Sequence, residues 1–145
     1  MLNHSTQTTT LEPAADVKRT FCVDEANRAL PYVSRVVADV VDLHDEVVHI
    51  RRTMERVELG LHGADAKALE RDYRAAMERL RVLVRELDMV GVDLHDFERG
   101  IVTFPTYHDG QDAALSWKLG EDEVRFWHSA DSGFDARQPI AQLIQ

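Results

Sequence analysis

Apolar residues recur at alternating steps of three and four over residues 33–61, for about four heptads. This spacing places them on one stripe of a helix and predicts a long amphipathic helix. Gly60 and Gly63 interrupt the series, Asp65 can cap a new start, and a second series follows over residues 66–90. Two such helices joined by a short segment run antiparallel and bury their stripes against each other.

The two predicted helices differ in length. With Asp24 as N-cap, the first runs over about residues 24–59, roughly 50 Å, and the second over residues 65–89, roughly 37 Å. Folding back from the joint leaves residues 21–34 without a partner from the second helix, so another element must cover them. Pro31 lies in this overhang and predicts a kink, because it lacks a backbone donor.

Beyond Gly91 the apolar period falls to 2, and glycines and prolines become frequent, which is typical of strands and turns. Asp109-Gly110 predicts a tight hairpin turn, and Gly120 begins a second turn. The predicted strands are residues 100–105, 113–119 and 124–128, with an edge strand at 92–97. A small meander needs a helix over one face, and the overhang is the obvious cover.

These elements predict an α+β fold: a long antiparallel, coiled-coil-like helical hairpin packed at one end on a small antiparallel β-meander. Residues 1–19 lack apolar periodicity and predict a disordered tail, which leaves residues 20–145 as a single domain. Within it we expect the hairpin at 20–91, the sheet at 92–128, and a C-terminal tail at 129–145 that wraps back.

Net charge and cysteine content limit which partners and which cellular compartment we expect. The net charge of −9 opposes binding to nucleic acid and to anionic membranes. One cysteine, Cys22, cannot form an internal disulfide and is expected in the core. With neither a membrane span nor a signal-like start in the sequence, we expect a cytoplasmic protein.

The negative charge is concentrated in the predicted sheet. Residues 92–145 carry 10 acidic and 4 basic groups, whereas residues 24–91 carry 14 and 11. A cation or a basic protein partner is therefore expected at the sheet end, in preference to a phosphate.

Several motifs in the sheet region resemble one known family. They are Phe97-Glu-Arg-Gly-Ile-Val-Thr-Phe-Pro105, Asp109-Gly110, Trp117-Lys-Leu-Gly-Glu121, Phe126-Trp-His128 and Gly133-Phe-Asp-Ala-Arg-Gln-Pro-Ile140, with Phe21-Cys-Val-Asp-Glu-Ala-Asn27 and Leu30-Pro31 near the start. They are similar to the bacterial family called domain of unknown function 2203. The resemblance implies site positions without a reaction, namely Glu98, Arg99, Trp117, Glu121, Trp127, His128 and Arg137.

His128 is the strongest single candidate for chemistry. A histidine at a strand end can bind a divalent metal or move a proton, and Asp131, His108 and Glu98 are candidate co-ligands. No two of these residues have a recognised ligand spacing. The alternative is a structural histidine, hydrogen-bonded to a carboxylate or a carbonyl, that holds the C-terminal tail.

Arg99 and Arg137 are expected near the same end of the sheet. An arginine paired with Glu98 or Asp131 would pin the C-terminus to the sheet. If both arginines were exposed and unpaired, they would instead form a small anion site.

Seven apolar residues lie outside the two helical seams, and a bare hairpin would leave them in water. They are Leu30, Val37, Val41, Val48, Met77, Val82 and Val84. A second copy of the chain could cover them in a twofold four-helix bundle, so a homodimer is expected. The alternative is that the sheet or the tail folds over them.

Together these features favour a non-catalytic, dimeric binding or interaction module that uses its acidic sheet end. Ligand contacts are expected from Glu98, Arg99, Trp117, Trp127, His128 and Arg137. The most useful observation in a structure would be whether a concave pocket lies between Trp117, Trp127 and His128. The alternative function is a metal-binding protein centred on His128. The sequence assigns no catalytic residue and leaves enzymatic activity open.

Overall fold

The computed structural model describes residues 19–142. The predicted disordered tail at residues 1–19 therefore lies, except for its last residue, outside the described residues. Two long helices, α2 (Val23–Glu58) and α3 (Ala66–Val90), precede the sheet. The remaining elements are β1 (Asp93–Asp96), β2 (Ile101–His108), β3 (Gln111–Lys118), β4 (Phe126–Ser129), η1 (Phe134–Ala136), β5 (Gln138–Pro139) and η2 (Ile140–Gln142).

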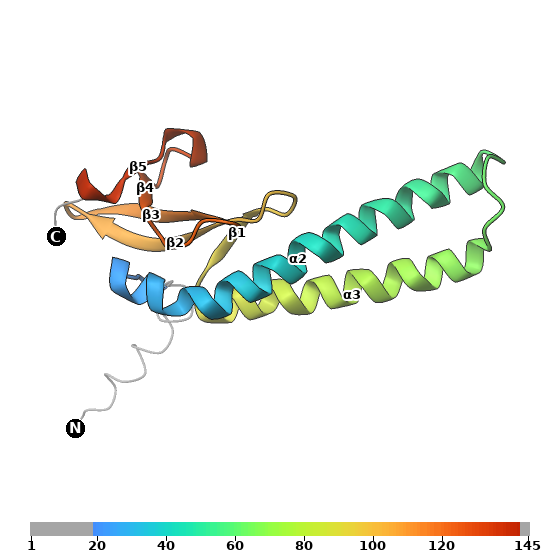
Figure 1. Ribbon diagram of the computed structural model, residues 1–145, viewed down its shortest axis with the longest axis horizontal. Helices are drawn as coiled ribbons and strands as arrows, with labels where there is room; N and C mark the ends of the chain where they lie inside the picture. The colour runs from blue at the N-terminus through green and yellow to red at the C-terminus, as the bar shows by residue number, and fades with distance from the viewer. Residues whose placement is uncertain (1–18, 143–145) are drawn as a thin grey trace, which may run out of the picture.

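The helical hairpin is confirmed. α2 and α3 pack side by side and project away from the sheet (Figure 1). The Asp65 carboxylate accepts the Lys67 N–H and begins α3, and Gly91, at φ 98°, ends it in the left-handed conformation. The buried seam positions are Val33, Val36, Val40, Leu43, Val47, Ile50, Ala76, Leu80 and Leu87. No helix within residues 19–142 combines the length and apolarity that crossing a membrane requires.

α2 starts earlier than predicted. Its N-cap is Cys22 rather than Asp24, because the extended backbone of Cys22 lets its N–H donate to the Glu25 carboxylate, 2.9 Å away. That hydrogen bond holds the pKa of Glu25 below its usual value. Cys22 is exposed, so the expectation that it belongs to the core was wrong.

The part of α2 that α3 leaves uncovered is shorter than predicted. α2 continues through Pro31, and the Tyr32 hydroxyl donates to the Glu86 carboxylate of α3 at 3.2 Å. The two helices are therefore linked about one turn closer to the start of α2 than we expected from counting residues back from the joint between them. Before that point the chain packs on the sheet: Phe21, just ahead of α2, meets Phe104 edge-to-face at 5.2 Å, and Asn27 Oδ1 in α2 accepts the Val124 N–H at 2.7 Å.

The sheet is a five-stranded antiparallel meander in the order β1-β2-β3-β4-β5. The Asp109-Gly110 turn is confirmed between β2 and β3, with both residues at positive φ. Pro105 was predicted to end β2, but the strand continues through it. Pro105 lies past the end of β1, so its lack of an N–H breaks no hydrogen bond with that strand, and its carbonyl accepts the Phe21 N–H at 2.7 Å.

The C-terminal tail was underestimated. Within residues 129–142 the chain forms β5, in which Gln138 pairs with Trp127, and the Ile140 N–H donates to the Arg125 carbonyl at 2.8 Å. These backbone bonds make the returning segment a fifth strand rather than a loose wrap.

Strand alternation gives the sheet two unlike faces. One face packs on α2 and contributes Val102, Phe104, Leu115 and Trp117 to the core. The N-terminal turns of α2 lie under this side of the sheet (Figure 1). The other face, opposite α2, carries polar side chains of β1 to β4; we call it the open face.

Gly100 supplies a sharp test of the contact between α2 and the sheet. Its φ is 71°, and an added Cβ would lie 2.8 Å from Leu119 Cβ and 3.0 Å from Val37 Cγ1. Gly100→Ala should lower the free energy of unfolding by about 2–4 kcal/mol, measured by urea denaturation. Gly110, at φ 75° with nothing within 4 Å, is the matched control, and Gly110→Ala should cost only about 1 kcal/mol. Equal losses would contradict the packing described.

Candidate functional site

The open face holds a concave cavity of about 620 Å³. Strands β1 to β4 form most of its floor and walls, and the segment after β4 closes one side. Its lining residues are Thr20, Asp93, His95, Thr103, Pro105, Thr106, Tyr107, Asp112, Ala113, Ala114, His128, Ala130 and Ser132. Cavities of this size accommodate small-molecule ligands.

His128 lies in this cavity with 6% of its surface exposed. Its Nδ1 is 2.9 Å from the carbonyl oxygen of Ser129. Because a carbonyl can only accept, Nδ1 carries the proton, and in the neutral ring Nε2 keeps its lone pair. Nε2 has no hydrogen-bond partner among residues 19–142 and is not sealed from solvent. The ring is therefore held in place and presents an acceptor.

The same face of the sheet carries a polar pair, Thr103 in the cavity lining and Ser116 beside it on β3, that sequence reasoning missed. Thr103, 5% exposed, lies with its hydroxyl 2.8 Å from His95 Nε2. Ser116 is the register partner of Thr103 on β3; it is fully buried, and its hydroxyl has no partner within the described chain. A threonine and a serine buried within apolar strands were the signal that could have identified this face.

The proposed metal ligands do not gather around His128. His108 extends from the opposite face of the sheet, where its ring lies 4.8 Å from that of Trp127. Glu98 is in the turn between β1 and β2, and Asp131 is exposed and accepts a hydrogen bond from Ser129 Oγ at 2.8 Å. The part of the chain that is described contains no group of three His, Cys, Asp or Glu side chains suited to a metal ion. Sequence proximity misled here, because neighbouring strand positions point to opposite faces.

The two tryptophans are also separated from His128. Trp117 is 1% exposed in the core, and its Nε1 donates to the Glu121 carbonyl at 3.0 Å. Trp127 packs against the same core, and its Nε1 has no partner in residues 19–142. The strand register thus places both tryptophans on the face opposite His128, so these three side chains do not line one pocket, and the cavity lies on the His128 face.

Arg137 fixes the C-terminal segment, through a different partner from those expected. Both of its terminal nitrogens donate to the Glu121 carboxylate, and its guanidinium stacks between Phe126 and Phe134, 4.2 and 4.0 Å from the ring centres. Neither Glu98 nor Asp131 takes part. A bidentate, partly buried pair of this kind is geometrically specific.

Arg99 has a local role. Its backbone N–H and guanidinium, with the Glu98 N–H, bind the Asp96 carboxylate and hold the pKa of Asp96 below its usual value. The Arg99–Asp96 ion pair, at 3.0 Å, closes the turn between β1 and β2. Since Arg99 and Arg137 each have a carboxylate partner, they do not form the unpaired anion site considered above.

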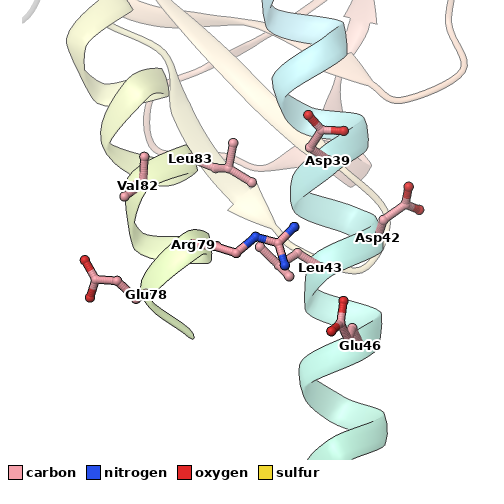
Figure 2. A pocket seen from close by; sticks show the side chains of 8 residues that line it. All are labelled: Asp39, Asp42, Leu43, Glu46, Glu78, Arg79, Val82 and Leu83. Carbon is pink, nitrogen blue, oxygen red and sulfur yellow. The ribbon is translucent and has the colours of Figure 1, made fainter. Parts of the chain in front are cut away.

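A second concavity, of about 480 Å³, lies between the two helices (Figure 2). Leu43 and Leu83 form its floor, while Asp39, Asp42 and Glu46 line one side. Arg79 reaches across from α3 toward α2 (Figure 2). Helix side chains alone form this groove, and it contains none of the predicted site residues.

Comparison with known proteins agrees with the motifs of the sheet. Residues 19–140 match DUF2203, described as "Uncharacterized conserved protein". The chain belongs to this family. No curated protein and no solved structure matches it. The DUF2203 match spans the hairpin, the sheet and the contacts of Arg137 with Glu121, Phe126 and Phe134, which we call the Arg137 clamp. It assigns no activity.

The Arg137 clamp can be tested by amide hydrogen exchange. Arg137→Gln removes the guanidinium from both rings and from Glu121, so exchange of the Ile140 amide should accelerate at least tenfold. Arg125→Gln is the matched control, since Arg125 pairs with Asp122 and Glu123 at a side-chain exposure of 55% and should change that rate little. Unchanged exchange in Arg137→Gln would show that the strand pairing alone holds the segment.

Proposed function

We propose that this DUF2203 protein is a cytoplasmic, non-catalytic binding module whose ligand occupies the open-face cavity. The observation that carries the proposal is the His128 side chain, which is 94% buried yet keeps an unpartnered acceptor at the cavity. A ligand in the cavity would displace water from this nitrogen, and leaving it without a partner would then cost about 1–3 kcal/mol, so a ligand with a donor at this position is favoured.

We favour ligand binding over catalysis because polar groups of the cavity already form hydrogen bonds within the protein. The Thr103 hydroxyl is bonded to His95, and the proton on His128 Nδ1 is held by the Ser129 carbonyl. Such contacts fix side-chain positions and form a rigid polar surface, which suits recognition.

Filling the cavity tests the proposal. Ala114 lines the floor, so Ala114→Trp should block the site, whereas Ala75→Trp, on the exposed side of α3, should not. The probes are 1,4-diaminobutane, butane-1,4-diol and succinate, titrated into ¹⁵N-labelled protein. At least one probe should shift the amides of Thr103 and Ser129 saturably in the wild type and in Ala75→Trp, but not in Ala114→Trp. If no probe binds, or if filling the cavity has no effect, the proposal fails.

We also propose that the module is a homodimer through the hairpin, on narrower support than the sequence suggested. Of the apolar residues outside the seams, Leu30 and Val37 are buried, and Val41 and Met77 pack against the core, so these four need no second copy to cover them. The other three are Val48 and Val84, half-buried and outside the core cluster, and Val82, which is 39% exposed. Val48 and Val84 support a second copy, because they remain without apolar cover.

Charge substitutions on α3 test the dimer. Val84→Asp should weaken dimerisation at least tenfold in light scattering over a range of concentrations, because it buries a carboxylate in the interface. Val82→Asp is the control: two residues away, it lies about 200° around the helix and should have little effect. A monomeric wild type, or equal effects of the two substitutions, would refute this interface.

A further inference from the structure

We infer that the open-face cavity selects small organic cations that carry N–H donors, that is, ammonium or guanidinium compounds. This inference rests on the proposed function, because it presumes that the cavity binds a ligand. Three features carry it: the charge of the lining, the acceptors of the floor and the composition of the rim.

The lining of the cavity is acidic. It contains two carboxylates, Asp93 and Asp112, and no lysine or arginine. Arg99, Arg125 and Arg137 pair with carboxylates outside this lining, and Arg19, next to Thr20, has its guanidinium over the Phe21 ring. Low-dielectric walls of one sign concentrate ligands of the opposite charge and repel anions.

The floor requires a ligand that donates hydrogen bonds. His128 presents Nε2 as an acceptor, and its donor is already committed to the Ser129 carbonyl. The Thr103 hydroxyl, bonded to His95, has further acceptor capacity. A ligand with only acceptors, such as a carboxylate or phosphate, would leave the buried His128 unpaired, whereas an N–H donor satisfies it.

The rim combines a carboxylate with an aromatic ring. Tyr107 and Asp112 are register partners in the β2–β3 hairpin, both exposed at the mouth of the cavity, with Tyr107 61% exposed. A carboxylate beside an aromatic face is a favourable setting for an organic cation, through ion pairing and cation–π attraction. A ligand with a cationic group at each end could contact the rim and the floor together.

A matched probe set separates charge from shape. 1,4-Diaminobutane, butane-1,4-diol and succinate share four carbons but end in ammonium, hydroxyl and carboxylate groups. With full-length protein, monitored by amide shifts around the cavity, the diamine should bind at least tenfold more tightly than either of the others. Agmatine, with one guanidinium and one ammonium, should bind at least as well as the diamine.

Substitutions then locate the selectivity. Asp112→Asn should weaken diamine binding at least threefold, while Asp109→Asn, three residues earlier in the turn and outside the lining, should leave it unchanged. His128→Phe removes the acceptor and keeps an aromatic ring, so diamine affinity should fall at least tenfold. If His128→Phe does not fold, Thr103→Val, which removes the other acceptor of the floor, and Asp112→Asn still test the selectivity, and both should weaken diamine binding.

The outcomes distinguish this inference from the proposed function. If the diol or succinate binds as tightly as the diamine, and Ala114→Trp blocks it, the cavity is a binding site but its cation selectivity is refuted. If the diamine binds equally well to Asp112→Asn and His128→Phe, it reports only the acidic surface, and the inference is wrong. If no probe binds, the inference and the proposed function fall together.

Discussion

The fold depends on α2 having two apolar faces along its N-terminal half. One face packs on α3 through the heptad seam, while Val37 and Val41, on the other, come so close to Gly100 that only a glycine fits there. A single helix thus belongs to both layers and fixes their relative position. Without the sheet, Val37 would be in water, and without α2 a small meander could not bury its aromatic residues.

Because a single helix, α2, covers the sheet, a site can form only on the uncovered face. α2 covers only one face of the antiparallel sheet, so the face opposite α2 remains available. Alternation sends Thr103, Ser116 and His128 to that face, where neighbouring strands and the returning C-terminal segment bury them. Polar groups buried on an otherwise uncovered face create the combination of rigidity and accessible hydrogen-bonding capacity that ligand sites share.

Sequence reasoning succeeded where the signal was local or periodic. The heptad series predicted the hairpin, and Asp109-Gly110 predicted the tight turn, because spacing and turn chemistry act over a few residues. It failed where long-range pairing decides. β5 depends on Gln138 meeting Trp127, and Arg137 pairs with Glu121, 16 residues away. The candidate site divided similarly: His128 was identified, but its neighbours were assigned by sequence proximity, although the sheet register places His108 on the opposite face.

The Arg137 clamp and the cavity are linked by the chain between them. Ala130 and Ser132 form one wall of the cavity, and the Ala130 N–H donates to the Asp112 carbonyl at 3.2 Å. A few residues later, Arg137 fixes the same segment between two aromatic rings and Glu121. The motifs that led to the DUF2203 resemblance, Trp117 to Glu121 and Gly133 to Ile140, therefore need not contact a ligand to matter for binding. In the proposed function they would hold the wall against which the ligand packs, which would make Arg137 and Glu121 positioning residues for the cavity.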